Sequence, residues 1–176
     1  NMADFAGKGN RRPQLDIPIE LIDLGPLNPR IVSYTNGRKD LSQLDLVSVL
    51  YEYFDTQTVA MSLIANGYFD EEPIIIVPSS IPSGLSFEQF DNPDDLANEL
   101  KKFVEKGSIK FTVIEGNRRV STIKLLLDKV LREKVSVEKS YPTTDNDKIL
   151  DDIRTIPCII YSKREDVSTY LGVRHI

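Results

Sequence analysis

Cysteine and histidine are scarce in this chain, which limits the chemistry that it can carry. Its 176 residues contain a single cysteine, Cys158, and a single histidine, His175. One cysteine excludes an internal disulfide framework and a cysteine-rich zinc site, and one histidine excludes a histidine-rich metal site. We therefore expect a protein of the reducing cytoplasm, with Cys158 as a small buried apolar residue.

Long apolar runs and an excess of basic residues are also lacking. No stretch approaches the ~20 apolar residues that a membrane-spanning helix needs, so we expect no membrane partner. The 22 lysines and arginines are outnumbered by 27 aspartates and glutamates, which gives a net charge of −5. The domain as a whole would repel a phosphate backbone, and nucleic-acid binding would need a local basic patch.

The order of the predicted elements indicates one domain of the α+β class. Apolar patterns predict strands at 17–24, 71–78, 109–116 and 156–161. Helical spacing of apolar residues predicts helices at 40–54, 56–67, 93–107, 118–131 and 163–172. We expect a compact mixed α/β fold with a small mixed sheet flanked by helices.

Particular residues mark the ends of several predicted helices. Ser42 is a candidate N-cap for the helix at 40–54, and Gly67 is a candidate C-terminal stop for the next helix. Pro93 and Gly107 bracket the third helix, in the positions that proline and glycine favour at helix ends.

The N-terminal segment differs in composition from the rest of the chain. Residues 1–15 are polar and without periodicity, which predicts a flexible arm, and the domain would occupy residues 16–176. Within it, a helical insertion is expected at about residues 79–108. Because Asn1 precedes Met2, we expect the native chain to start at Met2. Because the chain stops on apolar Ile176, we expect a fragment of a longer protein.

The sequence Gly-Asn-Arg-Arg occurs twice, in two different settings. The first copy, at residues 9–12, lies in the polar arm and precedes a proline. The second copy, at residues 116–119, lies between a predicted strand and a predicted helix. Gly116 and Asn117 both tolerate the left-handed backbone that such a junction needs. We therefore assign functional interest to the second copy alone.

The second copy has the features of an anion site. The first turn of a helix carries unpaired N–H groups and the positive end of the helix dipole. Arg118 and Arg119 oppose that dipole, a cost that a bound anion would offset, and they supply planar donors for phosphate. The alternative is a structural pair of arginines that faces solvent or binds a carboxylate such as Glu115.

Four stretches resemble segments of the ParB/sulfiredoxin superfamily, and they follow one another along the chain in the same order as in that superfamily. VIEGNRRVSTIKLL resembles its signature strand, turn and helix, where members carry Gly, a polar residue, Arg or His, and Arg. IPIELIDLGPLNPR resembles the opening strand and its Asn-Pro-Arg-type loop, and NGYFDEEPIIIVP resembles the second strand. IPCIIYSKREDVSTYLGVRHI resembles the later strand and the helix before a second phosphate-contacting motif.

This resemblance implies a nucleotide-binding domain. In the superfamily the signature turn holds a nucleotide phosphate: ParB proteins bind and hydrolyse CTP, and sulfiredoxin and free-serine kinase relatives use ATP or ADP. The implied ligand is CTP or ATP with Mg²⁺. The implied phosphate-contacting residues are Gly116, Asn117, Arg118, Arg119, Asn28, Arg30, Arg174 and His175.

The leading hypothesis is thus a ParB-like nucleotide-binding domain from a bacterial or phage DNA-related system. Hydrolysis, where it occurs, would be slow and would act as a switch. DNA would be bound through other parts of the full-length protein, and a homodimer is a further expectation from the resemblance.

Two alternatives remain open at the level of sequence. A nuclease or phosphotransferase of the same fold would need a carboxylate, for which Glu115 and Glu72 are the catalytic candidates, with Glu71 beside them. A degenerate domain used for protein interaction or dimerisation is favoured by the poor match to the second motif. Sulfiredoxin chemistry is not expected, because asparagine or arginine occupies the position of its reactive cysteine. The sequence assigns no metal ligands.

Overall fold

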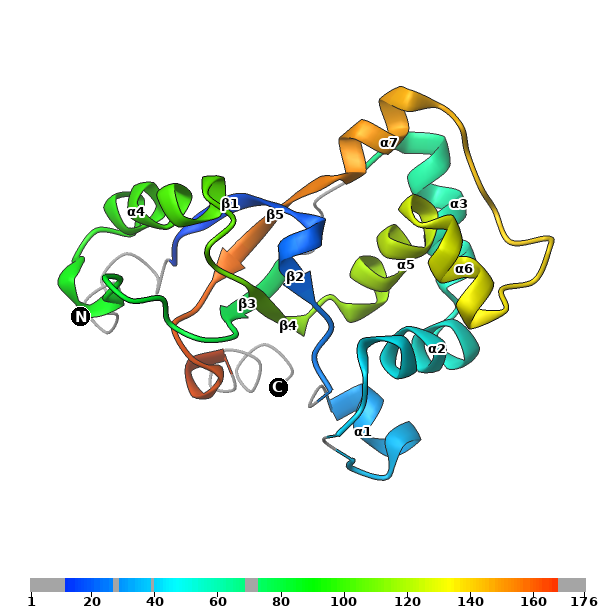
Figure 1. Ribbon diagram of the computed structural model, residues 1–176, viewed down its shortest axis with the longest axis horizontal. Coiled ribbons are helices and arrows are strands. Elements are labelled where there is room, and N and C mark those ends of the chain that lie inside the picture. The colour runs from blue at the N-terminus through cyan, green and yellow to red at the C-terminus, as the bar shows by residue number, and fades with distance from the viewer. Residues whose placement is uncertain (1–11, 27–28, 39, 69–72, 168–176) are drawn as a thin grey trace.

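The computed structural model describes residues 12–26, 29–38, 40–68 and 73–167 of the chain (Figure 1). One mixed sheet of five strands, in the order β1-β5-β3-β4-β2, is flanked by helices. This arrangement confirms the predicted α+β class. The strands are β1 (Gln14–Pro18), β2 (Ile22–Asp23), β3 (Ile74–Pro78), β4 (Phe111–Glu115) and β5 (Thr155–Ile160).

The helices gather at the two ends of the sheet. They are α1 (Pro29–Thr35), α2 (Gln43–Tyr53), α3 (Thr56–Asn66), α4 (Pro93–Glu105), α5 (Asn117–Leu127), α6 (Lys129–Val135) and α7 (Asp147–Ile153), with 3-10 turns η2 (Ile19–Leu21) and η3 (Phe87–Gln89). Helices α2, α3, α5 and α6 form one group, whereas α4 lies apart from them and packs against β1 (Figure 1). Among the described helices, none is long and apolar enough to cross a membrane.

The single strand predicted at 17–24 is wrong, because the turn η2 divides it into β1 and β2. These two strands pair with opposite edges of the sheet: β1 is antiparallel to β5, and β2 is parallel to β4. In a flat sheet, four strand spacings would separate them by about 19 Å. The four residue steps from Pro18 to Ile22 reach at most about 14 Å. The sheet must therefore curl so that its two edges approach each other at this end.

The central strands are buried on both faces, as their continuous apolar sequences predict. Ile74 and Ile76 of β3 belong to the main core, under the helices. Ile75 and Val77 alternate to the other face, where a second cluster also contains Ile114, Tyr161 and Val167. The segment that follows β5 therefore covers the second face of the sheet.

The helix ends predicted from single residues are confirmed. Ser42 and Asp45 form a capping box at the start of α2, each side chain accepting a hydrogen bond from the other's backbone N–H. Gly67 ends α3 at φ 71°, and Pro93 occupies the first turn of α4. These boundaries depend on contacts between residues a few positions apart in the chain, so the sequence alone identifies them.

The single helix predicted at 118–131 is also wrong. Asp128 has extended backbone (φ −124°, ψ 101°) and separates α5 from α6, where its carboxylate caps the new helix by accepting from Leu131 N–H. The break turns α6 away from the axis of α5. Val130, which helical spacing from Ile123 and Leu127 would place on the apolar face of one continuous helix, is consequently exposed. Aspartate is favourable at the N-cap of a helix and unfavourable in its interior. This preference outweighs the apolar periodicity that predicts one continuous helix.

The predicted N-terminal arm of residues 1–15 extends too far. β1 begins at Gln14, and Arg12, the last residue of the first Gly-Asn-Arg-Arg copy, lies with its guanidinium 5.1 Å from the centre of the Tyr161 ring. The earlier part of the arm, residues 1–11, lies outside the described residues. Helices α1 and α7 were not predicted; both are short, with seven residues each.

Cys158 is fully buried in β5, as predicted for a small apolar residue. Burial away from water raises the pKa of its thiol well above the ordinary value, because the thiolate would lose its hydration. The thiol is therefore protonated in the folded chain at neutral pH and is a poor nucleophile.

We predict that the native protein resists alkylation by iodoacetamide at pH 8, whereas the protein in strong denaturant is alkylated fully at Cys158 within the same time. Intact-mass spectrometry measures both. Rapid modification of the native chain would mean that β5 opens readily or that the thiol is accessible.

Candidate functional site

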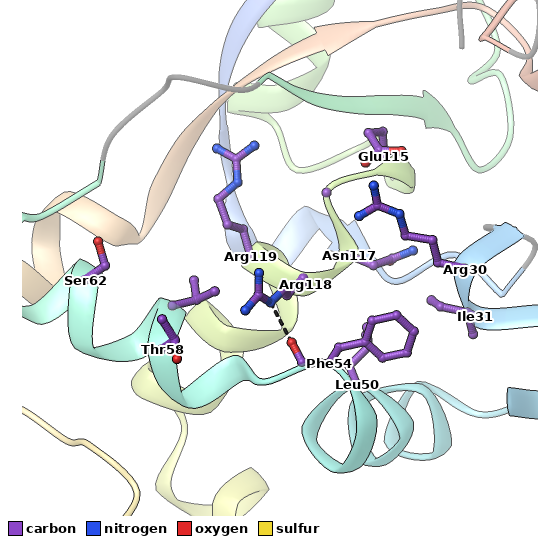
Figure 2. Close-up of a pocket in the computed structure, with 12 residues that line it drawn as sticks. Arg30, Ile31, Leu50, Phe54, Thr58, Ser62, Glu115, Asn117, Arg118 and Arg119 are labelled. Atoms are coloured by element: carbon purple, nitrogen blue, oxygen red, sulfur yellow. Dashed lines mark hydrogen bonds between the residues drawn. The ribbon is translucent and has the colours of Figure 1, made fainter. Parts of the chain in front are cut away.

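A pocket of about 340 Å³ opens where β4 ends and α5 begins (Figure 2). The second Gly-Asn-Arg-Arg copy forms its floor, and α1, α2 and α3 supply its walls. The lining residues are Arg30, Ile31, Leu50, Phe54, Thr58, Val59, Ser62, Glu115, Gly116, Asn117, Arg118 and Arg119. The structure thus brings five of the predicted phosphate-contacting residues, and the predicted catalytic Glu115, to one place.

Gly116 makes the turn from β4 into α5. Its φ of 116° lies in the region that residues with a side chain rarely adopt. A Cβ at this position would also stand 2.4 Å from Cδ1 of Ile74 on the neighbouring strand. The backbone of the turn consequently packs directly against β3, and the pocket floor is built from main chain at this point.

The side chain of Asn117 is buried and holds the turn in place. Its Oδ1 accepts a hydrogen bond from Gly25 N–H at 3.0 Å, and its Nδ2 donates to Gly25 C=O at 3.2 Å. Gly25 in turn lies so close to β4 that a Cβ would stand 2.0 Å from Val113 O. Because the amide is used in this way, a phosphate contact by Asn117 would come from its backbone N–H.

Arg118 crosses from α5 to the corner between α2 and α3 (Figure 2). Its Nε donates to Phe54 C=O at 2.5 Å and its Nη2 to Asp55 C=O at 2.9 Å. The Phe54 carbonyl lies at the C-terminal end of α2, where the helix dipole favours a cation, and Asp55 is the next residue, at the start of α3. The cost of an arginine at the start of α5 is therefore offset here by protein carbonyls, a role that the sequence alone assigns to a bound anion.

Asp55 adds a charge to the same corner. It has left-handed backbone (φ 48°) and caps α3, accepting from the backbone N–H and the hydroxyl of Thr58. The hydrogen bonds from Thr58, and then the Arg118 guanidinium at 3.7 Å, lower the pKa of the Asp55 carboxyl. Its contribution to stability is present at neutral pH and is lost as the pH falls through the lowered pKa.

Arg119 points in a different direction from Arg118 (Figure 2). Its Nη1 donates to the hydroxyl of Tyr68 at 3.1 Å, and its guanidinium lies 5.8 Å from the centre of that ring. Arg30 reaches the pocket from the opposite wall, on α1, with Glu115 on the same side (Figure 2). Among the described residues, three guanidinium groups and one carboxylate therefore line the pocket, on a chain whose net charge is −5.

The start of α5 differs from the other helix starts. Side chains cap α2, α3, α4, α6 and α7 through Ser42, Asp55, Asn92, Asp128 and Asn146. Among the α-helices whose N-caps the structure describes, α5 alone has no side-chain cap, and its first turn contains no acidic residue. The N-cap residue therefore adds no side-chain cap at the positive end of the dipole, which borders the pocket.

The remaining predicted site residues belong to other segments of the chain. Asn28, Glu72, Arg174 and His175 lie outside the described residues, as does Glu71. Within the described part of the chain, no group of three or more His, Cys, Asp or Glu side chains could hold a metal ion. The apolar wall of the pocket was not predicted from the sequence. Its residues have the spacing of ordinary core residues: Ile31, Leu50, Phe54 and Val59.

Comparison of the chain with protein-family models, with curated proteins and with solved structures finds no match. The resemblance to the ParB/sulfiredoxin superfamily therefore stays a prediction from four short stretches of sequence.

We predict that Asn117→Ala lowers the free energy of unfolding by about 2–4 kcal/mol, because it leaves the N–H and C=O of Gly25 buried without partners. Urea denaturation followed by circular dichroism measures the loss. The control is Asn146→Ala, which removes an exposed N-cap and should cost only about 1 kcal/mol. Equal losses for the two variants would contradict the structural role assigned to Asn117.

We predict that Arg118→Ala lowers the free energy of unfolding by about 1 kcal/mol, since it removes two partly exposed hydrogen bonds to the α2–α3 corner. Arg118→Lys should recover little of the loss, because an ammonium group cannot reproduce the planar fork. Arg154→Ala, which removes an exposed pair with Asp151, is the matched control and should be neutral. An unchanged denaturation midpoint for Arg118→Ala would show that the corner does not depend on it.

Proposed function

We propose that the pocket at the start of α5 binds the phosphate group of a nucleotide. The observation that carries this proposal is the uncapped N-terminus of α5, which opens into a pocket with an excess of arginine. An anion at a helix N-terminus is stabilised by both the N–H groups and the dipole. Side chains of the protein cap the starts of α2, α3, α4, α6 and α7, whereas the start of α5 has no such cap and borders the pocket.

The phosphate would lie over the turn at Gly116. The absence of a side chain at that residue lets a ligand approach the main chain, and the N–H groups of the first turn of α5 would donate to phosphate oxygens. Arg30 and Arg119, on opposite sides, would add charge-assisted hydrogen bonds. Arg118 lines the same pocket while its Nε and Nη2 hold the α2–α3 corner.

The rest of the pocket suits the nucleoside. Ile31, Leu50, Phe54 and Val59 form an apolar wall, with Thr58 and Ser62 as polar groups beside it. The volume of about 340 Å³ lies at the lower end of the range for small-molecule sites, which accommodates a ligand of mononucleotide size. Apolar surface with a few polar groups is the usual lining of such a site.

A divalent cation would reach this site with the nucleotide. Mg²⁺ is commonly held by substrate phosphates together with one or two carboxylates, and Glu115 is the described carboxylate that lines the pocket. The resemblance to the ParB/sulfiredoxin superfamily would make the nucleotide CTP or ATP and would place the domain in a bacterial or phage DNA-related system. A slow hydrolysis would draw on Glu115 to orient water.

The proposal is tested by calorimetric titration with CTP, ATP and GTP, each with and without Mg²⁺. At least one nucleotide should bind. Arg30→Ala and Arg119→Ala should each weaken binding by about tenfold or more, since each removes a charge-assisted contact of about 1.5–3 kcal/mol.

Arg154→Ala is the control for this experiment, because it removes the same charge outside the pocket and should leave affinity unchanged. The proposal fails when no nucleotide binds, or when Arg154→Ala weakens binding as much as the two pocket variants do.

A further inference from the structure

Two exposed tyrosines form a stacked pair beside the pocket. Tyr34 of α1 and Tyr53 of α2 have ring centres 4.7 Å apart with an angle of 21° between the planes. Their exposed fractions are 49% and 57%, so the pair offers a large area of aromatic surface to water. Aromatic rings give most to a fold when they are buried, and two exposed rings held together point to use by a ligand.

The pair lies next to two residues that line the pocket, Phe54 and Arg30. Phe54 follows Tyr53 in the chain, lines the pocket, and meets Tyr34 edge-on with ring centres 5.2 Å apart. Arg30 and Tyr34 are four residues apart on α1 and so lie on the same side of that helix. A ligand whose phosphate reaches Arg30 therefore has an aromatic surface next to it, outside the pocket.

We propose that the pocket and the tyrosine pair together bind the end of a single-stranded nucleic acid. The terminal phosphate occupies the start of α5, the first nucleoside lies along the apolar wall, and the following base stacks on the tyrosine pair. This inference rests on the proposed phosphate binding and deepens it by naming the class of ligand. Stacking of bases on aromatic side chains is the common means by which single strands are held without sequence preference.

Charge explains why the ligand is the end of a strand. Proteins that follow a long single strand do so along an extended basic groove. Here the net charge is −5, and the described lining of the pocket places three arginines and one glutamate close together. A terminal phosphate, which carries more charge than an internal one, fits such a point site better than a continuous backbone does.

The test compares ligands that differ in one feature at a time. Calorimetry measures the affinity for a mononucleotide and for oligothymidylate of about four nucleotides bearing a 5′-phosphate, a 3′-phosphate or neither, with oligouridylate as the ribose counterpart. A phosphorylated oligonucleotide should bind about tenfold more tightly than the mononucleotide, the gain expected for one stacked base. The form without a terminal phosphate should lose most of its affinity.

Variants of the tyrosine pair separate stacking from folding. Tyr53→Ala should remove the tenfold gain for the oligonucleotide and leave mononucleotide affinity unchanged, whereas Tyr53→Phe should retain the gain because the ring is preserved. Val130→Ala is the control: this residue on α6 is exposed to the same 57% and lies outside the pocket lining.

The outcomes distinguish this inference from the proposed function. When a mononucleotide binds but the oligonucleotide binds no more tightly, or Tyr53→Ala has no effect, the inference is overturned and phosphate binding stands. When neither ligand binds, both are overturned. A protein that self-associates through the tyrosine pair, seen as a concentration-dependent mass that Tyr53→Ala abolishes, would also overturn it.

Discussion

The pairing of the Asn117 amide with the backbone of Gly25 fixes the geometry on which the pocket depends. It joins the start of α5 to the segment after β2, 92 positions away in the chain, and it satisfies both buried groups of the glycine. Gly116 can then pack closely against Ile74, and this contact fixes the angle between α5 and the sheet. The direction of Arg118 and the position of the first turn of α5 at the pocket both follow from that angle.

Arg118 and Arg119 are neighbours in sequence that act in separate parts of the structure. Arg118 binds carbonyls at the α2–α3 corner, and Arg119 binds the hydroxyl of Tyr68. Each guanidinium is thus positioned by the protein before any ligand arrives, which lowers the conformational entropy that binding would cost. The pocket is preorganised by the same contacts that hold the surrounding helices together.

Sequence reasoning located this junction and the ends of α2, α3 and α4, because glycine, proline and capping residues act within a few positions of where they stand. It failed where distant contacts decide. The turn that splits 17–24 depends on a curled sheet, whereas the break at Asp128 follows from the capping preference of that residue, which the apolar periodicity conceals. Asn117 and Arg118 bind partners on distant segments, and Tyr34 stacks on Tyr53 of another helix. No local sequence pattern indicates that these segments lie close together.

The path of residues 14–23 has a consequence for the integrity of the sheet. Both edge strands, β1 and β2, come from this one short segment, and each covers a strand that would otherwise expose a row of unpaired backbone groups. A protease cut or truncation that released the segment would uncover β5 and β4 together. Each molecule would then have two unpaired edge strands, and other copies of the chain could pair with both. This segment therefore protects the chain against open-ended β-sheet assembly.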